Sequence, residues 1–310
     1  MIKSRFLRES LSAYRSIVEI DPERVGEISK DRSAVVGRNN WCFIYEGSNG
    51  YRRSYISRDF LSLGDAWARV IEARQSYCNR QGIQFLQVII PNKATLLPEC
   101  YPEILPTDMS FPLQGLLASN VDANLLVPIA EFRSESVREA IFRRNDSHLT
   151  VAGNVYLMEL ILEKLELSDF HSDVIDTHRV SHVGDLGGKF ETVLSELCHA
   201  PIWNKGLLNQ ESVEKVKDVQ AVGFNGIEQL FLNPIAPINS KVAVIGNSFF
   251  ERVPSWGASP FCSALFQEYL FRWSPTLEFS AIGCNTEILI CQTCERFLNR
   301  VPEDVFDYWM

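Results

Sequence analysis

The sequence contains no long apolar run, no internal repeat and no low-complexity segment, and each absence excludes a class of protein. A membrane-spanning helix needs an apolar stretch of about 18 residues or more. Solenoids and propellers need a repeat. Residues 1–19 mix basic and acidic side chains with apolar ones, unlike a secretory signal peptide. We therefore expect a cytoplasmic protein, whose 8 cysteines are reduced thiols rather than a disulfide framework.

Positive charge is also scarce. Thirty Lys and Arg residues face 39 Asp and Glu residues, which gives a net charge of -9 without a basic cluster, and we expect no nucleic-acid partner. The 46% hydrophobic and 22% charged residues are typical of a folded globular protein. The length of 310 residues fits one large domain or two small ones. We expect an N-terminal helical segment at 1–34 and a main domain at 35–310.

Hydrophobic periodicity predicts alternating strands and helices along most of the main domain. The segment from 171 to 226 is expected to be an irregular insertion. Because buried strands alternate with amphipathic helices, we predict an α/β fold with a mostly parallel sheet. The expected helices are 5–19, 58–81, about 131–143, 151–165 and 261–271, and the expected strands are 41–45, 85–90, 125–127, 242–245, 277–282 and 288–291.

The segment Gly246-Asn247-Ser248-Phe249-Phe250 directly follows the predicted strand at 242–245, which places Ser248 at the carboxyl end of the strand. Open α/β sheets place their ligand sites at the carboxyl ends of strands, so this hydroxyl is expected in a crevice. If a helix begins here, the backbone N–H groups of Ser248 and its successors, such as Phe249, are suited to hold an oxyanion. A serine that only caps the helix explains the same residues equally well.

A catalytic serine needs a base, which is usually a histidine oriented by a carboxylate. The Asp-x-His pattern occurs three times, at Asp146/His148, 169/171 and 176/178. The first lies in a polar loop before a helix that Thr150 is placed to cap. Two residues that are two positions apart face each other only where the chain is not helical, and the predicted polar loop meets this condition. The other two pairs lie in the irregular stretch, where a solvated loop is the better interpretation.

Neither a metal site nor a redox site is expected. His171, His178 and His182 have aspartates nearby, among them Asp185, but their spacing matches no ligand pattern. Cys291 and Cys294 form a single pair, too little for structural zinc, and are expected to pack as small apolar side chains.

Six short blocks occur in order along residues 35–300. The blocks are Gly37-Arg38-Asn39-Asn40-Trp41-Cys42-Phe43-Ile44, Ile90-Pro91-Asn92-Lys93-Ala94-Thr95 with Pro98-Glu99, Asp146-Ser147-His148-Leu149-Thr150 with Gly153, Gly184-Asp185-Leu186, Val244-Ile245-Gly246-Asn247-Ser248-Phe249 and Glu295-Arg296-Phe297-Leu298. Together they resemble the SGNH-hydrolase-like domain of the alginate O-acetylation proteins. The resemblance implies a flavodoxin-like three-layer α/β/α fold in which Ser248 is the nucleophile, His148 the base and Asp146 the acid that orients it. It also implies that the Asp-x-His block precedes the serine block, the reverse of ordinary SGNH esterases.

Several further residues are candidates for the oxyanion site or for substrate binding. Asn247 stands where the family often has Asp, and its side chain can donate a hydrogen bond near the oxyanion. Gly184 and Asp185 belong to a segment expected to supply a backbone donor. Lys93 and Arg296 each follow a predicted strand and can hold a carbohydrate or a carboxylate, although a charged residue at the sheet rim explains each of them too.

The sequence therefore predicts a serine-dependent carbohydrate O-acetyltransferase or acetylesterase that works through an acyl-enzyme, without cofactor or metal. Its partners would be a carbohydrate acceptor, an acyl donor and proteins of polysaccharide synthesis. The alternative is a non-catalytic carbohydrate-binding or scaffold protein, in which aromatic residues such as Trp256 and Trp273 stack on sugars. Transfer and hydrolysis differ only in what attacks the acyl-enzyme, and the sequence does not distinguish them.

Overall fold

The computed structural model describes residues 14–47, 50–135, 137–167, 176–202, 210–221, 223, 225–251, 257–283 and 285–306. The strands are β1 (Ala34–Val36), β2 (Cys42–Ile44), β3 (Gln84–Ile90), β4 (Leu125–Leu126), β5 (Thr177–His182), β6 (Glu196–Pro201), β7 (Glu214–Val219), β8 (Glu228–Leu232), β9 (Ile238–Gly246), β10 (Phe266–Trp273) and β11 (Ile288–Cys294). The α-helices are α2 (Arg53–Ile56), α3 (Leu61–Gln81), α4 (Lys93–Leu96), α5 (Phe111–Ala118), α6 (Ile129–Arg133), α7 (Arg138–Ile141), α8 (Val151–Lys164) and α9 (Ser259–Leu265).

The central sheet has the strand order β4-β3-β11-β9-β10-β8-β7. The strands from β4 to β10 run parallel to their neighbours, whereas β8 and β7 are added antiparallel at one edge. β11 is the last of these strands in sequence, yet it lies between β3 and β9: Ile290 pairs with Leu86 on one side and with Val244 on the other. The predicted α/β class with a mostly parallel sheet is confirmed.

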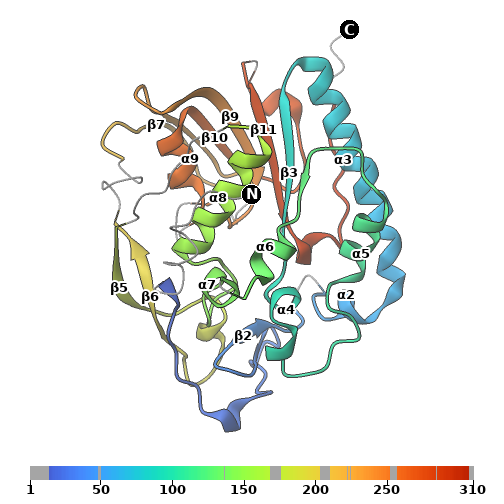
Figure 1. Ribbon diagram of the computed structural model, residues 1–310, viewed down its shortest axis with the longest axis vertical. Coiled ribbons are helices and arrows are strands. Elements are labelled where there is room, and N and C mark those ends of the chain that lie inside the picture. Colours follow the sequence, from blue (N-terminus) through green and yellow to red (C-terminus); the bar gives the residue numbers. More distant parts are fainter. Residues whose placement is uncertain are drawn as a thin grey trace.

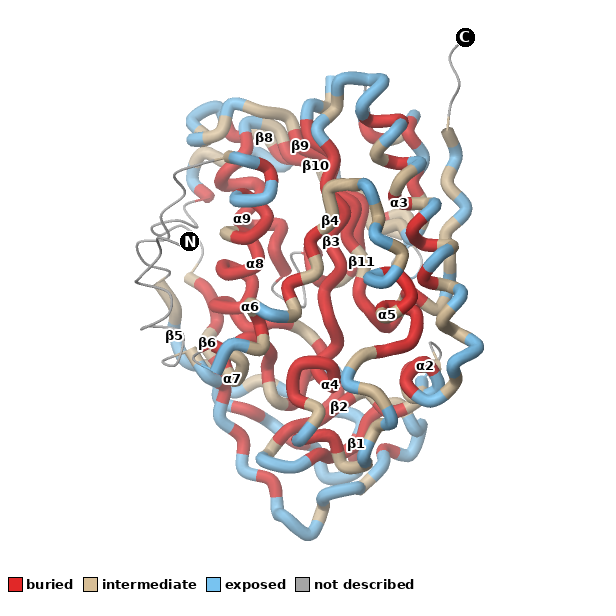
Figure 2. The backbone as a smooth tube through the Cα atoms, turned by 45° about the vertical axis from the view of Figure 1, so that its right-hand side comes forward, coloured by how far each residue is buried: buried red, intermediate tan, exposed pale blue. Residues whose placement is uncertain are grey.

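Helices cover both faces of this sheet (Figures 1 and 2). Along β9, Val242 and Val244 point into the core beneath α8 and α9, and Ala243 and Ile245 point into the core beneath α3 and α5. This alternation is the period-two pattern of a strand buried on both faces. It produces the three-layer arrangement.

Local signals set several boundaries as expected. α8 begins after Thr150, whose side chain accepts a hydrogen bond from the N–H of Gly153. α3 ends at Gly82, whose φ of 69° is the left-handed conformation that glycine adopts at helix ends.

Other expectations are wrong. Residues 261–271 are predicted as one helix, but the helix ends at Leu265 and the chain continues as the strand β10. The pairing of β10 with β9 and β8 is the reason, because it overrides the helix-like spacing of the apolar residues. Residues 277–282 contain a 3₁₀ turn at Phe279–Ala281 instead of a strand. Within the expected irregular insertion at 171–226, the described residues include the strands β5, β6 and β7, and β7 belongs to the main sheet; the domain bounds stay a prediction.

The predicted N-terminal helix falls mostly on residues outside the described part, and residues 14–19 form no α-helix. Ile17 instead bridges to Leu197, and Ile28 to Val35. No helix in the described residues is long and apolar enough to cross a bilayer. The expected cytoplasmic location stays a prediction.

Candidate active site

Ser248 lies in a tight turn at the carboxyl end of β9. The turn is closed by a hydrogen bond from the N–H of Phe250 to the carbonyl oxygen of Asn247, 2.9 Å long. The described residues that directly follow it, 249–251, are not helical, and α9 begins only at Ser259, so the expected helix N-terminus is not what presents Ser248. The strand end alone places this hydroxyl at the edge of the sheet, in the position typical of open α/β sheets.

His148 projects from the loop between α7 and α8. Phe142 and Leu149 form an antiparallel bridge across the base of this loop, and the N–H of Arg143 donates to the carbonyl of His148. The loop is therefore a short hairpin, which lets Asp146 and His148 face the same way. The predicted non-helical loop is confirmed.

A continuous chain of hydrogen bonds joins the three predicted side chains. Ser248 Oγ lies 2.8 Å from His148 Nε2, and His148 Nδ1 lies 2.7 Å from Asp146 Oδ1. An ionised carboxylate can only accept, so Nδ1 carries the proton and Nε2 is left to accept the proton of Ser248. The predicted proximity of Ser248 and His148, 100 residues apart in sequence, is confirmed.

Asp146 is held from both sides. Its Oδ1 also accepts from the backbone N–H of His148, 2.9 Å away, and its Oδ2 lies 3.1 Å from Arg143 Nη1 and 3.0 Å from His182 Nε2. Burial alone would raise the pKa of Asp146, but the charge of Arg143 and the hydrogen bonds from His148 and His182 outweigh it and hold this pKa well below its usual value. The carboxylate is therefore ionised and fixed in orientation.

His182 is a site residue that the sequence analysis missed. It ends β5, and pairing with β6 sets it opposite Glu196. The sequence indicates His182 only as a metal ligand whose spacing fits no pattern, whereas its ring contacts both Arg143 and Asp146. These contacts join residues 36 and 39 positions apart, so no local sequence motif indicates them.

Asp185 and Gly184 contact the loop that carries Asp146 and His148. Asp185 accepts hydrogen bonds from the backbone N–H and the hydroxyl of Ser147, 2.6 and 2.5 Å long. A Cβ at Gly184 would lie 2.3 Å from the carbonyl oxygen of Asn145 and 2.6 Å from the Cβ of Asp146. Gly184 thus packs against the acid rather than beside the serine, and its expected donation to an oxyanion is not what the structure shows.

The expected oxyanion donors next to Ser248 are already engaged. The side-chain oxygen of Asn247 accepts from the N–H of Phe249 at 3.2 Å, and its nitrogen donates to the thiol sulfur of Cys294 at 3.4 Å. Both groups therefore stabilise the turn that presents the serine. The N–H of Phe249 is used within this turn and is not directed at an oxyanion. The bond to Cys294 uses one of the two amide protons of Asn247, so its donation to an oxyanion through the second proton stays a prediction.

Lys93 stabilises the protein's own backbone. It is 5% exposed, and its ammonium lies 2.8, 2.8, 3.1 and 2.7 Å from the carbonyl oxygens of Cys42, Arg143, Arg144 and Asp146. Burial lowers the pKa of Lys93 to about 8. The expected role in holding a ligand is wrong, because these carbonyls use all three ammonium protons. Lys93 ties β2 to the loop that carries Asp146 and His148.

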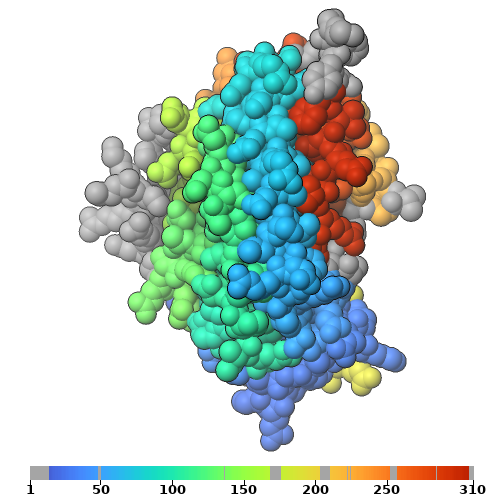
Figure 3. Space-filling view, turned by 90° about the vertical axis from the view of Figure 1, so that its right-hand side faces the viewer, coloured from blue at the N-terminus to red at the C-terminus, as the bar shows by residue number. Residues whose placement is uncertain are grey.

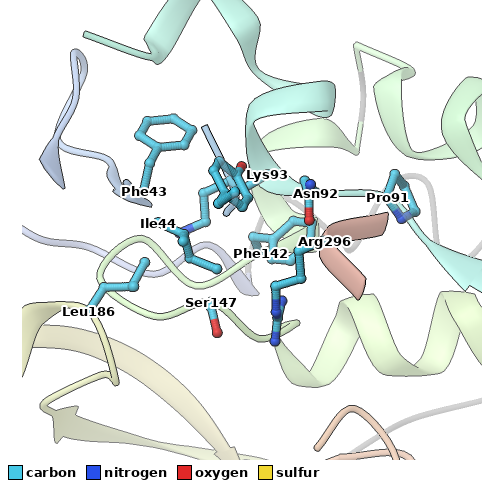
Figure 4. A pocket seen from close by; sticks show the side chains of 10 residues that line it. Phe43, Ile44, Pro91, Asn92, Lys93, Phe142, Ser147, Leu186 and Arg296 are labelled. Carbon is cyan, nitrogen blue, oxygen red and sulfur yellow. The ribbon is translucent and has the colours of Figure 1, made fainter. Parts of the chain in front are cut away.

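Arg296, by contrast, stays a candidate for binding. It is 9% exposed, and its guanidinium carbon lies 5.4 Å from the ring centre of Phe249 and 5.0 Å from that of Phe297. The ring of His148 lies 5.2 Å from the same Phe249 ring. Arg296, Lys93 and Ser147 line a small pocket of about 10 Å³, shown in Figure 4. Within the described residues Arg296 has no hydrogen-bond or ion-pair partner, so its N–H groups are available to an acyl or sugar oxygen.

Asp146, His148 and Asp185 bring potential ligand atoms within 4.8 Å of one another. These atoms already accept hydrogen bonds. Asp146 is bonded to the rings of His148 and His182 and paired with Arg143. Asp185 accepts from the N–H and the hydroxyl of Ser147. A metal ion would have to displace several of these donors. The group fits a proton-transfer site better than a metal site. Two members of the group of histidines and aspartates after residue 170, His171 and Asp173, lie outside the described residues.

The neighbours of Cys291 and Cys294 agree with the expected packing. Both thiols are buried on β11, and burial raises the pKa of Cys291 to about 11. Each is therefore a protonated thiol at neutral pH.

Comparison with known proteins points to one group of relatives. No protein-family model matches the chain. A curated protein of Pseudomonas aeruginosa, named probable alginate O-acetylase AlgJ, is 26% identical over 234 residues, which cover 72% of this chain and 56% of the relative. The chain thus spans about half the length of the curated relative that it matches.

Solved structures share the fold. Bacillus cereus PatB1, solved with a sulfonyl adduct, has a TM-score of 0.58 at 14% identity and covers 86% of this chain and 94% of that chain. The O-acetyltransferase domain of Pseudomonas putida AlgJ has a TM-score of 0.53 at 14% identity, with coverage of 87% and 94%. This chain therefore resembles the alginate O-acetylation proteins in sequence and shares their α/β fold with a mostly parallel sheet, as its motifs predicted.

Proposed function

We propose that this chain is a serine-dependent carbohydrate O-acyltransferase or esterase with Ser248, His148 and Asp146 as its catalytic triad. The observation that carries the proposal is the unbroken hydrogen-bond chain from Ser248 Oγ through His148 to Asp146. The resemblance to an alginate O-acetylase and to an O-acetyltransferase domain supports acetyl as the group and a sugar hydroxyl as its acceptor.

The geometry supports the following sequence of steps. Ser248 Oγ attacks the carbonyl carbon of an acyl donor while His148 Nε2 takes the hydroxyl proton. The tetrahedral intermediate collapses, the bond to the leaving group breaks, and His148 returns the proton to that group. A sugar hydroxyl then attacks the acyl-enzyme, and His148 takes its proton and passes it to Ser248 Oγ as the new ester leaves. Water in place of the sugar gives hydrolysis.

Asp146 makes these proton transfers possible. Its fixed, ionised carboxylate keeps the His148 proton on Nδ1 and stabilises the imidazolium that forms in both steps. The Phe249 N–H and one amide proton of Asn247 are used within the turn, which leaves the second amide proton of Asn247 and a nearby positive charge to stabilise the oxyanion. The guanidinium of Arg296, next to Phe249, is the positive charge we assign to that role or to binding the acyl donor.

Labelling with a fluorophosphonate probe tests the proposal, because such probes react with an activated serine. We expect one adduct, on Ser248 by mass spectrometry, no adduct in Ser248→Ala, and labelling at least about a hundredfold slower in His148→Ala. Hydrolysis of an activated acetyl ester should fall in both variants, and the double variant should be little worse than either single one, since members of one catalytic unit are not additive. His178→Ala, which changes an exposed β5 residue, is the control and should label normally.

A folded wild-type protein that does not label would favour the non-catalytic alternative, a carbohydrate-binding or scaffold protein. Association with polysaccharide-synthesis proteins is a further part of the proposal that rests on the resemblance. Co-purification with proteins encoded beside it would support that part.

A further inference from the structure

A second, larger cavity lies on the sheet face that α3 covers. Its volume is about 510 Å³, within the range of about 300–1,000 Å³ typical of small-molecule sites. It is lined by the ends of three parallel strands, with Gly246 at the end of β9, Asn247 after it, Ser274 after β10 and Thr293 on β11. Figure 3 shows this side of the molecule, where α3 and the C-terminal segment lie side by side. The cavity is separate from the small pocket beside Arg296.

Aromatic rings form part of its wall. Trp67, Trp273 and Phe297 line it, and the indole N–H of Trp67 donates to the carbonyl of Leu298 at 3.0 Å, which fixes that ring. Trp273 and Phe297 are only partly buried, and both contribute atoms to the cavity wall. Flat aromatic surfaces of this kind pack against the C–H faces of sugar rings.

Polar groups without a protein partner face the same space. Within the described residues, Asn225, Thr293 and Glu303 make no side-chain hydrogen bond or ion pair. A few unsatisfied donors and acceptors among apolar walls are the usual composition of a ligand site. The combination suits a molecule that carries hydroxyl groups around an apolar ring.

The charges of the wall are balanced. Arg74 is buried and forms an ion pair with Asp304, with nitrogen–oxygen distances of 2.7 and 2.9 Å. The remaining charges are those of Arg300 and Glu303, one of each sign. The cavity thus has no excess positive charge with which to attract a carboxylate or a phosphate.

We infer that this cavity binds an uncharged sugar ring of the acceptor glycan, with Trp273 as its apolar wall and Thr293 and Asn225 as its hydroxyl partners. The inference rests on the proposed function, which makes the acceptor a carbohydrate. Asn247 connects the two sites, since it lines the cavity and is bonded to Ser248 in the chain.

Saturation-transfer NMR on the full chain carrying Ser248→Ala tests binding without turnover. The probes are the methyl β-glycosides of glucose, galactose and mannose, with methyl β-glucuronide as the charged match of the glucoside. We expect saturation transfer to at least one neutral glycoside and weaker transfer to the glucuronide. Adding Thr293→Val or Trp273→Ala should lower the neutral signal at least about fivefold. Thr192→Val, an exposed threonine near Arg24, is the matched control and should keep it.

Three results would overturn the inference: no transfer to any neutral glycoside, an unchanged signal in a folded Thr293→Val protein, or stronger transfer to the glucuronide than to the glucoside. The near-isosteric valine keeps the test valid if Trp273→Ala fails to fold. Serine labelling of the unsubstituted protein distinguishes the two proposals. Labelling without sugar binding refutes only the cavity assignment, and sugar binding without labelling refutes only the catalytic one.

Discussion

Replacing Lys93 by methionine removes a buried charge that holds in place the loop carrying Asp146 and His148. The ammonium lies within 3.1 Å of four backbone carbonyl oxygens, three of them in residues 143–146. Methionine fills much of the same volume but donates no hydrogen bond. The substitution therefore isolates the contribution of the ammonium.

The magnitude follows from two opposing effects. Each buried carbonyl left without a donor costs about 1–3 kcal/mol, and three protons serve them. In the other direction, the fall in the pKa of Lys93 from 10.5 to about 8 corresponds to roughly 3 kcal/mol against the charged form, a cost that methionine avoids. Three lost hydrogen bonds cost about 3–9 kcal/mol, and the avoided cost of roughly 3 kcal/mol leaves an expected net loss of ~3 kcal/mol in the free energy of unfolding, a large share of the ~5–15 kcal/mol typical of a folded protein.

Urea unfolding followed by tryptophan fluorescence at pH 7 measures the free energy of unfolding, and the rate of fluorophosphonate labelling reports on the loop. The free energy of unfolding and the labelling rate should both be lower in Lys93→Met than in the wild type. Lys189→Met is the matched control, because Lys189 is half-exposed and pairs with Asp31 at the surface, and it should lose less than about 1 kcal/mol. A Lys93→Met protein as stable and as reactive as the control would refute the reasoning.

The pH dependence gives a second test of the same residue. Because the folded-state pKa of about 8 is lower than the unfolded value of 10.5, the unfolded chain holds more protons between these two values. Stability contributed by this position must therefore rise with pH in that window, by up to ~1.4 kcal/mol per pH unit. The difference between wild type and Lys93→Met should grow from pH 8 to pH 10. A flat or shrinking difference would contradict the burial of a charged lysine.

Three further predictions concern the surroundings of the triad. Gly184→Ala places a Cβ 2.3 Å from a backbone carbonyl oxygen, so it should lower the free energy of unfolding by about 1–3 kcal/mol and slow serine labelling. The control Gly188→Ala, whose Cβ would have its closest contact at 3.3 Å, should have a much smaller effect. Equal effects of the two variants in urea unfolding would refute the packing argument. His182→Ala removes a donor from Asp146, so it should lower the maximal labelling rate and move the acid limb of the pH–rate profile upward by less than about one unit; an unmoved limb would make His182 merely structural. Chelation with EDTA should leave labelling unchanged, and a loss that zinc restores would show that Asp146 and its neighbours hold a metal.

The sequence predicts the catalytic candidates because their positions depend on local signals. A buried strand that ends before Ser248 and a polar loop before the capped helix α8 are both readable from a few neighbouring residues. The pairing of Ser248 with His148 is not local, and only the resemblance to a known family connects them across 100 residues. The hydrogen bond between them shows that this connection holds.

The supporting residues could not be predicted because their roles depend on contacts far apart in sequence. Lys93 follows a strand as a ligand-binding lysine would, but the carbonyls that it binds come from β2 and from the catalytic loop. His182 reaches Asp146 only because β5 pairs with β6 in one particular register. Likewise, Phe266–Trp273 has the spacing of a helix, and two neighbouring strands make it β10.

The position of β11 has a consequence for how the protein is made. His148 belongs to the half of the chain that contains β3 and β4, whereas Ser248 follows β9 in the other half, and β11 joins these two groups of strands. A ribosome synthesises β11 after every other strand of the sheet, so a nascent chain that stops before residue 288 holds two separate sheet fragments with exposed edges. We therefore expect the hydrogen bond from Ser248 to His148 to form late in synthesis, when β11 joins the two groups of strands.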